Sequence, residues 1–249
     1  MFKQNIIYKE EIDSTNTEIK RQAKAGAPEG TLVIAEEQTQ GKGRRGRDWN
    51  SPKGTGIWMS FLLKPAILPE KAASITLVAA LAVSKAIEKE TGLKAQIKWP
   101  NDLVVNGKKL CGILTEMSAE RDNIHYVVVG IGLNVNMKEF PKELPFATSL
   151  FLEGGRTYQK EALITAILQE FEDCYKEFLK TENLEKLRED YNKRLVNIDH
   201  QVQIIKNEEI LLGIARGVNV QGELLVETKE GIQNILSGEV SVRGVYGYV

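Results

Sequence analysis

The sequence predicts an α+β protein with two unequal parts, a larger part of strands and helices over residues 1–196 and a small β-barrel over residues 197–249. The segment 70–90 is apolar on most faces of a helix, so it is expected to lie buried against a sheet. Short strand-like segments separated by turn signals follow Asn197, a spacing typical of a small barrel. A chain of 249 residues can bury a full core and suits one large or two unequal domains.

The first elements are a strand, a helix and two further strands. Residues 6–12 have a strand pattern. Thr15 and Glu18 have the spacing of a capping box, which predicts a helix that begins at Thr15 and is ended by Gly26. Two more strands are expected, over residues 31–37 and 57–63.

The middle of the chain predicts a long helix, several strands and two more helices. Gly92 closes the helix over 70–90, and the pair Asn106-Gly107 predicts a tight hairpin between two strands. Strands are expected over 95–98, 103–105, 109–117 and 125–136, and helices over 157–180 and 184–195. The strands of the barrel are expected over 202–205, 210–215, 224–227, 232–236 and 239–242.

The composition excludes several classes of protein. A formal net charge of −1 argues against a dedicated nucleic-acid binder, which carries a clear basic excess. Cys111 and Cys174 cannot form a disulfide framework, and two histidines argue against a zinc site or a histidine-based triad. The apolar run 75–87 is interrupted by Ser84 and Lys85 and is too short to span a bilayer. We therefore expect a soluble cytoplasmic protein with no membrane partner.

The loop Gly41-Lys42-Gly43-Arg44-Arg45-Gly46-Arg47-Asp48-Trp49 is the most informative segment. Its glycines let the backbone approach a ligand closely, and its cations supply donors for phosphate or carboxylate oxygens. It matches G-x-G-x-x-G formally, but the breakers that follow exclude the helix that a dinucleotide fingerprint requires. No Gly-Lys-Ser/Thr of a P-loop is present. The loop predicts an anion site that orders around a nucleotide's phosphates; the alternative is a solvated basic turn.

Further motifs follow in a fixed order. They are Asp13-Ser14-Thr15-Asn16, the basic loop, Lys98-Trp99-Pro100-Asn101-Asp102, Lys109-Leu110-Cys111-Gly112-Ile113-Leu114, Gly130-Ile131-Gly132-Leu133-Asn134 and Leu236-Ser237-Gly238-Glu239-Val240. Together they resemble biotin protein ligase, also called biotin–acetyl-CoA-carboxylase ligase, over nearly the whole chain. The resemblance implies a mixed sheet flanked by helices, like a class II synthetase catalytic domain, followed by an SH3-like barrel. It also implies a reaction in which biotin and ATP form biotinyl-5′-AMP, and a carrier lysine then takes the biotinyl group.

The resemblance assigns catalytic roles to Lys109 and Arg44. A cation is needed between biotin's carboxylate and the α-phosphate, because two like charges ~4 Å apart repel by about 4 kcal/mol at a partly buried site. Lys109 matches the lysine that is expected to contact both groups. Arg44 matches a loop arginine that helps to bind the ligand and to retain the reactive adenylate. Without the resemblance, an ordinary hairpin lysine would be as good an interpretation of Lys109.

The remaining site residues are assigned by resemblance too. The positions expected to contact biotin are Ser14, Thr15, Asn16, Gln38, Lys42, Gly43, Arg44, Lys109, Gly112, Gly130 and Gly132. The positions expected near ATP are Arg44, Arg45, Arg47, Trp49, Lys98, Asn101 and Asn134, with Asp102 as a candidate magnesium ligand. Lys42 stands where arginine is common, which keeps the charge but loses the bidentate fork. For Trp49 a plain core anchor, and for Asp102 a role in orienting Lys98 or a hairpin amide, remain open.

The resemblance also implies partners and leaves rivals. The expected partner is a biotin carboxyl carrier protein or carrier domain, and a homodimer through the sheet edge is possible. The motifs begin at Asp13, so we expect a monofunctional ligase that binds no DNA. Cys111 has no nearby histidine and is expected to be a buried strand residue rather than a nucleophile. The rivals are a lipoate–protein ligase of the same fold and a non-enzymatic RNA-binding protein.

Overall fold

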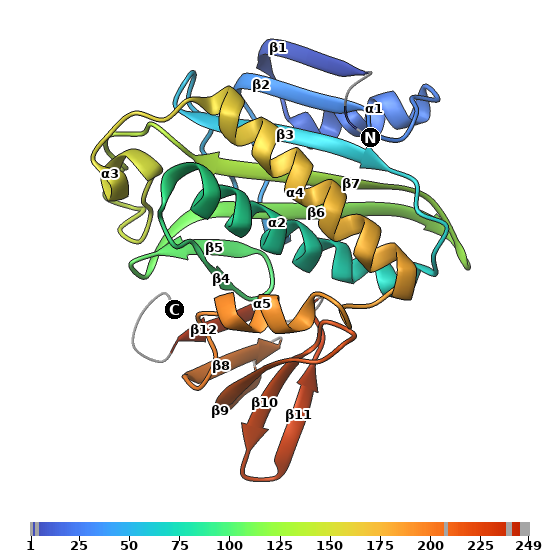
Figure 1. Cartoon of the computed structure of the whole chain (residues 1–249), viewed down its shortest axis with the longest axis vertical. Helices are drawn as coiled ribbons and strands as arrows, with labels where there is room; N and C mark the ends of the chain where they lie inside the picture. The colour runs from blue at the N-terminus through green and yellow to red at the C-terminus, as the bar shows by residue number, and fades with distance from the viewer. Residues whose placement is uncertain (1, 3–4, 207–208, 238–240, 245–249) are drawn as a thin grey trace.

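The computed structural model describes residue 2 and residues 5–206, 209–237 and 241–244. Its larger sheet has seven strands in the order β1-β2-β3-β7-β6-β5-β4 (Figure 1). The strands are β1 (Ile6–Ile12), β2 (Leu32–Gln38), β3 (Gly56–Leu63), β4 (Gln96–Lys98), β5 (Asp102–Val105), β6 (Lys108–Glu120) and β7 (Asn123–Asn134). β1 and β2 are parallel and all other neighbours are antiparallel, so the sheet is mixed, as expected.

Helices cover both faces of this sheet. The helices α2 (Ser74–Thr91) and α4 (Lys160–Thr181) lie across one face, as Figure 1 shows. α1 (Thr15–Lys24) packs on the opposite face, where Ile19 joins Val33, Leu62 and Val128 in a small separate core. Because side chains alternate along a strand, the neighbours of these valines and leucines point into the main core under α2 and α4.

α2 is buried on nearly all sides, which its apolar sequence predicts. The helix ends at Gly92, whose left-handed φ of 76° suits glycine. Its start differs from the expected residue 70, because a short 3₁₀ helix (Pro69–Ala73) precedes Ser74. Asn106 and Gly107 both have positive φ, so the predicted hairpin between β5 and β6 is confirmed.

The C-terminal part is a second, antiparallel sheet in the order β11-β10-β9-β8-β12. Its strands are β8 (Gln201–Lys206), β9 (Glu209–Val218), β10 (Leu224–Thr228), β11 (Gly231–Ile235) and β12 (Ser241–Gly244). Among the described residues β11 and β12 do not pair, so the five strands form an open sheet rather than a closed barrel. Part of the strand expected over 239–242 and of the motif 236–240 lies outside the described residues.

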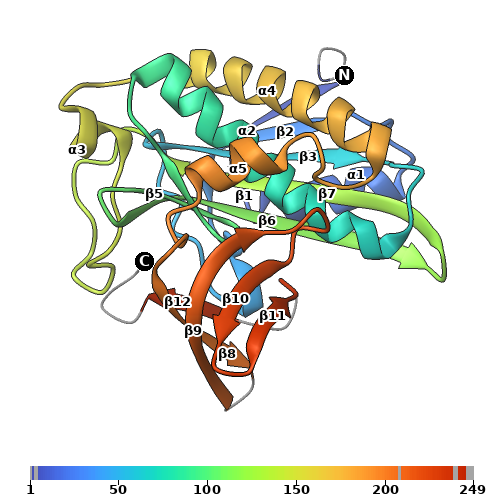
Figure 2. The same cartoon turned by 60° about the horizontal axis from the view of Figure 1, so that its bottom comes forward.

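The two sheets are joined by short helices and a continuous core. α5 (Arg188–Arg194) lies between them, while α3 (Leu150–Gly154) lies beside the strand ends of the larger sheet, where the N–H of Phe151 donates to the carbonyl of Val135 just after β7 (Figure 2). The indole nitrogen of Trp99 donates to the carbonyl of Gly222, 3.1 Å away, which ties β4 to the smaller sheet. A boundary at residues 196–197 stays a prediction. Within the described part of the chain, no helix is long and apolar enough to cross a membrane.

Candidate active site

A small pocket, with a cavity volume of about 40 Å³, opens where the start of α1, the basic loop and the strands β6 and β7 meet. Its walls bring together most of the residues that the sequence singled out, from segments far apart in the chain. The lining residues are Ser14, Thr15, Asn16, Gln38, Lys42, Gly43, Arg44, Trp49, Asn101, Lys109, Gly112, Ile113, Leu114, Gly130, Ile131 and Gly132. Ile113, Leu114 and Ile131 are apolar members that had not been predicted.

Glycines form the floor of the pocket, because a side chain at these positions would collide with Trp49 or Asn16. Gly112 and Gly132 face each other across β6 and β7. The indole of Trp49 lies on this pair: a Cβ at Gly132 would come within 2.5 Å of its Nε1, and one at Gly112 within 2.8 Å of its ring. A Cβ at Gly130 would be 1.9 Å from Oδ1 of Asn16. The three glycines thus make room for the indole of Trp49 and the amide of Asn16 at the pocket floor.

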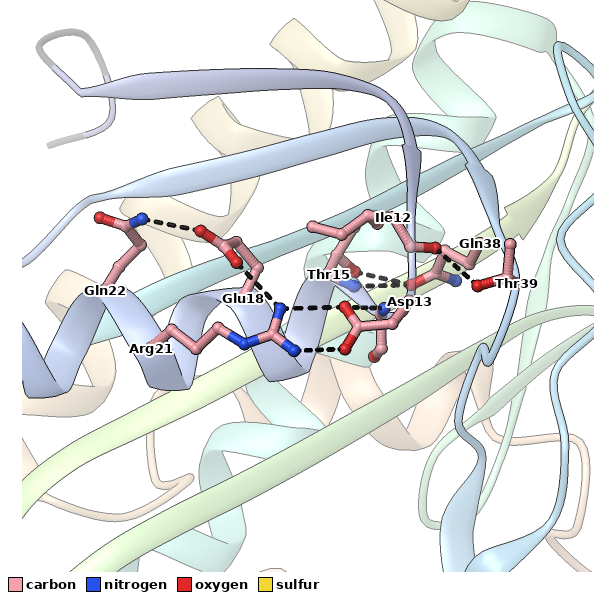
Figure 3. Close-up of polar contacts among 9 residues, drawn as sticks. Ile12, Asp13, Thr15, Glu18, Arg21, Gln22, Gln38 and Thr39 are labelled. Atoms are coloured by element: carbon pink, nitrogen blue, oxygen red, sulfur yellow. Dashed lines mark hydrogen bonds and ion pairs between the residues drawn. The ribbon is translucent and has the colours of Figure 1, made fainter.

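The polar triplet at the start of α1 is buried, and Figure 3 shows part of its surroundings. The backbone N–H and the hydroxyl of Thr15 both lie within hydrogen-bond distance of Oε1 of Gln38, at 2.8 Å and 3.0 Å. The predicted capping box is therefore wrong. Ser14 is the N-cap residue, and Glu18 reaches forward to Arg21 and Gln22 instead of back to the cap. Thr15 is not available for capping because its hydroxyl makes tertiary contacts.

Ser60 lies behind the triplet and had not been predicted. It is fully buried, with Oγ 2.7 Å from Oγ1 of Thr15 and 2.6 Å from Oδ1 of Asn16. On the other side of the triplet, Gln38 donates from Nε2 to Oγ of Ser51 at 2.8 Å. A serine in the middle of the otherwise apolar β3 was the available signal, since buried polar groups need partners.

Two more residues behind the pocket, Glu116 and Lys20, were missed. Asn16 donates from Nδ2 to Oε2 of Glu116 at 2.9 Å, and Nζ of Lys20 lies 2.5 Å from Oε1. Burial on its own would raise the pKa of Glu116, but the hydrogen bonds from Lys20 and Asn16 outweigh it and hold that pKa below its ordinary value. A single acidic residue on a strand gave no sequence signal for this role.

Lys109 projects from the start of β6 into the pocket. Its Nζ lies 2.7 Å from Oδ1 of Asp102 and 5.1 Å from the centre of the Trp49 ring. Asn101 also donates to Oδ1 of Asp102, at 3.2 Å. Asp102 is thus engaged with a cation and an amide, the arrangement expected for a residue that orients its neighbours.

Arg44 crosses the pocket mouth from the basic loop. Its guanidinium donates to Oδ1 of Asn101 at 2.8 Å and to the backbone carbonyl of Ser237 at 2.5 Å. Burial lowers the pKa of Arg44, and the nearby carboxylate of Asp102 opposes this shift. An arginine remains charged under these conditions, so a cation is held at the edge of the pocket.

Five predicted residues do not line this pocket, and one of them, Asp102, lies against Lys109 instead. Arg45 and Arg47 face a second cleft on the outer side of the loop, together with Glu116. Asn134 is buried and donates to the carbonyl of Thr148 at 2.9 Å. Lys98 is buried on β4, opposite Asp102 in the register of β5. The assignment of the other four to ATP stays a prediction.

The described residues contain no group of three or more histidine, cysteine or acidic side chains that could hold a metal ion. A magnesium ion needs several oxygen ligands, so Asp102 could serve only together with a ligand's phosphates and water. Both cysteines are free and buried. Burial raises the pKa of the Cys111 thiol strongly, which fits the predicted inert strand residue.

Comparisons with known proteins agree with this geometry. The profile of the Biotin/lipoate A/B protein ligase family matches residues 8–134, and that of the Biotin protein ligase C terminal domain matches residues 198–243. A bifunctional ligase/repressor BirA from Bacillus subtilis is 40% identical over 242 residues, which cover 96% of this chain and 74% of that protein. A biotin–[acetyl-CoA-carboxylase] ligase from Paracoccus denitrificans is 32% identical, covering 93% and 98%.

A solved structure is also similar over the full length. It is a biotin protein ligase from Aquifex aeolicus in complex with biotin and ATP, with a TM-score of 0.85 and 32% identity. The match covers 97% of this chain and 100% of that one. Both the family profiles and the relatives span the larger sheet and the C-terminal sheet. This chain therefore belongs to the Biotin/lipoate A/B protein ligase family, among its biotin protein ligases.

Proposed function

We propose that this protein is a biotin–[acetyl-CoA-carboxylase] ligase, which activates biotin with ATP and transfers it to a lysine of a carrier protein. The observation that carries the proposal is the convergence of Lys109, Arg44 and the buried triplet 14–16 on one glycine-floored pocket. The polar triplet offers partners for the polar edge of a ring, and the two cations fit a carboxylate and a phosphate. Relatives with that activity and a neighbour that binds biotin and ATP support the same conclusion.

In the first step an oxygen of the biotin carboxylate attacks the α-phosphorus of ATP. A new P–O bond forms, the bond between the α- and β-phosphates breaks, and pyrophosphate leaves. Lys109 lies at the pocket wall with Asp102 behind it, so its ammonium can neutralise both reacting anions. Its contribution is positioning and electrostatic stabilisation rather than covalent chemistry.

In the second step the amine of a carrier lysine attacks the acyl carbon of the adenylate. A C–N bond forms, the bond to the phosphate oxygen breaks, AMP leaves, and the attacking amine loses a proton. Until then the adenylate must be kept from water. Arg44 bridges from the basic loop to Asn101 and Ser237, so it is suited to hold the loop over the intermediate.

The nucleotide would lie toward Trp49 and Asn101, with Arg45 and Arg47 reaching the phosphates from the outer cleft. Trp49 offers an aromatic face beside the glycine pair. Magnesium would supply charge neutralisation on the phosphates of ATP when bound. Asp102 is the carboxylate in reach, and its contacts with Lys109 and Asn101 suit it also to orienting those residues.

The carrier is proposed to be a biotin carboxyl carrier protein or carrier domain, since related proteins carry the name of a carboxylase ligase. A homodimer through a sheet edge belongs to the same proposal. We place the reaction in the cytoplasm, because two free buried thiols suit a reducing compartment.

The deciding experiment is pyrophosphate release from ATP and magnesium with biotin, with lipoate and with neither. Release that depends on biotin is the expected result. Release with lipoate alone would keep the fold and overturn the ligand assignment. No release with either acid would overturn the enzymatic function and return the basic loop to a binding role.

A further inference from the structure

A chain of hydrogen bonds runs behind the inner wall of the pocket, and it connects α1 with β6 on one side and with β2 and β3 on the other. Its members in order are Lys20, Glu116, Asn16, Ser60, Thr15 and Gln38. Only some of them touch the pocket directly. The two ends of the chain decide whether the hydroxyl groups between them meet donors or acceptors.

At one end, the orientation of the Asn16 amide is fixed by acceptors. Its Nδ2 faces Oε2 of Glu116 at 2.9 Å and the carbonyl of Leu114 at 3.2 Å. An ionised carboxylate and a backbone carbonyl can only accept, so the NH₂ group of Asn16 must point toward them. Lys20 keeps the carboxylate of Glu116 in place and ionised. Consequently the carbonyl oxygen of Asn16 must face Ser60 and Gly130.

At the other end, the orientation of the Gln38 amide is fixed by a donor. The backbone N–H of Thr15 donates to Oε1 of Gln38 at 2.8 Å. This leaves Nε2 to donate to Oγ of Ser51 at 2.8 Å. The chain therefore ends in a carbonyl oxygen here as well, and that oxygen faces the hydroxyl of Thr15.

Counting hydrogens between these two ends gives a deficit. Oδ1 of Asn16, Oγ of Ser60, Oγ1 of Thr15 and Oε1 of Gln38 follow one another at 2.6, 2.7 and 3.0 Å. Three oxygen–oxygen contacts need three hydrogens, but the two hydroxyl groups supply two. One contact is therefore without a hydrogen, which is costly in a buried place. A single N–H from a ligand that reaches Oδ1 of Asn16 would supply this acceptor, so that the hydroxyl of Ser60 could donate to Thr15 and that of Thr15 to Gln38.

We propose that Glu116, held by Lys20, is a positioning residue that fixes the direction of this hydrogen-bond chain, so that the inner wall of the pocket accepts a ring N–H of the substrate. The proposal rests on the proposed function, in which the ureido ring of biotin offers two N–H donors. It assigns ligand selection to a carboxylate that does not itself touch the ring. A ligand that brings no N–H donor, such as a dithiolane ring, leaves the deficit in place.

The test compares biotin with its two derivatives methylated on one ureido nitrogen, in wild-type protein and in Glu116→Gln. The wild type should disfavour at least one derivative by about 10- to 100-fold in KM, as expected for an unsatisfied buried acceptor. In Glu116→Gln the new amide can present either its oxygen or its NH₂ to Asn16, so the orientation of the Asn16 amide is held by one fixed acceptor, the carbonyl of Leu114, instead of two. The KM for biotin should then rise about 10- to 100-fold at unchanged kcat and unchanged KM for ATP. The ratio of the KM for the methylated derivative to the KM for biotin should fall toward one.

Glu120→Gln is the matched control, since Glu120 lies four residues along the same strand and is exposed. It should change neither KM nor the discrimination. If wild type releases pyrophosphate with biotin but Glu116→Gln keeps the wild-type discrimination, the inference is wrong while the proposed function stands. If wild type shows no biotin-dependent release, the proposed function itself fails.

Lys20→Met provides a second variant in case Glu116→Gln does not fold. It leaves the carboxylate in place but removes its cation, and Lys42 on the basic loop is then the other charged group acting on it. The pKa of Glu116 should rise, so the KM for biotin should start to increase at a higher pH than in wild type as the pH is lowered. An unchanged pH dependence would contradict the proposed role of Glu116.

Discussion

Nζ of Lys109 lies 2.7 Å from Oδ1 of Asp102, although the two residues are not opposite each other in the sheet. Asp102 faces Gly112 across β5 and β6, and an irregularity after Leu103 shifts the register so that Lys109 faces Val104. This shift aims the lysine back along the strand toward the carboxylate. The pair is only partly exposed, and the ion pair holds the lysine in place at the pocket wall.

Lys109→Met should reduce biotin-dependent pyrophosphate release by about 100- to 1,000-fold, the range for loss of one stabilising donor in an active site. The substitution keeps most of the side-chain length, so the pocket wall should persist. Lys108→Met is the control, because Lys108 is the exposed neighbour on the same strand. Turnover of Lys109→Met near that of the wild type would remove this lysine from its assigned role.

Asp102→Asn separates two roles for that carboxylate. If Asp102 orients Lys109, turnover should fall about tenfold or more with an unchanged magnesium dependence. If Asp102 binds the metal, the magnesium concentration at half-maximal rate should rise instead. Titrating magnesium at saturating ATP and biotin distinguishes the two outcomes, and a variant that behaves like wild type in both respects excludes both.

Gly132→Ala should displace Trp49, since the added Cβ would lie 2.5 Å from Nε1 of the indole. We expect a loss of ~1–3 kcal/mol in the free energy of unfolding from this overpacking. The double variant with Trp49→Ala should recover much of that loss, because the clash has been removed. Urea unfolding of the four proteins in this cycle measures the coupling, and additive effects would show that the two residues do not meet.

The two cysteine thiols should be unreactive toward disulfide reagents in the folded protein. Cys111 is completely buried, and burial raises the pKa of Cys174 to about 11. At pH 8 an aromatic disulfide reagent should therefore titrate no thiol before unfolding and two thiols in guanidinium chloride. Cys111→Ala should keep turnover within about threefold of wild type, and its loss would reopen a covalent mechanism.

Acid should destabilise the protein partly through Glu116. Its pKa is lower in the folded state than in the unfolded chain, so its contribution is complete above about pH 4.5 and is lost as the pH falls through the folded value. Lys20 and Lys42 are the cations that lower this pKa. Glu116→Gln should therefore lose less stability than wild type between pH 7 and pH 3. Parallel acid profiles in urea unfolding would contradict the lowered pKa.

Local sequence patterns predicted most helices and strands, because these elements depend mainly on the residues within each segment. The strand over 6–12 and the hairpin at Asn106-Gly107 follow from strand-forming residues and from turn chemistry, which need no distant partner. The capping box failed because the hydroxyl of Thr15 is used by Gln38 and Ser60, a tertiary contact that no local rule contains. α3 was missed because five residues are too few for a helical period to show.

The part of the candidate site that consists of sequence motifs was predictable. The single residues that contact the pocket wall from outside the pocket were not. The basic loop and the glycines of β6 and β7 stand out in the sequence, and they line the pocket. Glu116 and Lys20 sit on different elements and look like ordinary surface charges until α1 packs on the sheet. The partner of Arg44 lies 193 residues further along the chain, so only the folded arrangement reveals it.

The contact between Arg44 and the carbonyl of Ser237 has a practical consequence for protein engineering. The pocket itself is built from the N-terminal half of the chain, which invites trimming the enzyme to that half for use as a compact labelling tool. Such a trimmed tool would lose the carbonyl of Ser237 that Arg44 of the basic loop contacts, and it would release its activated acyl group into solution. If Arg44 retains the adenylate as proposed, such a tool would then modify nearby lysines without selection.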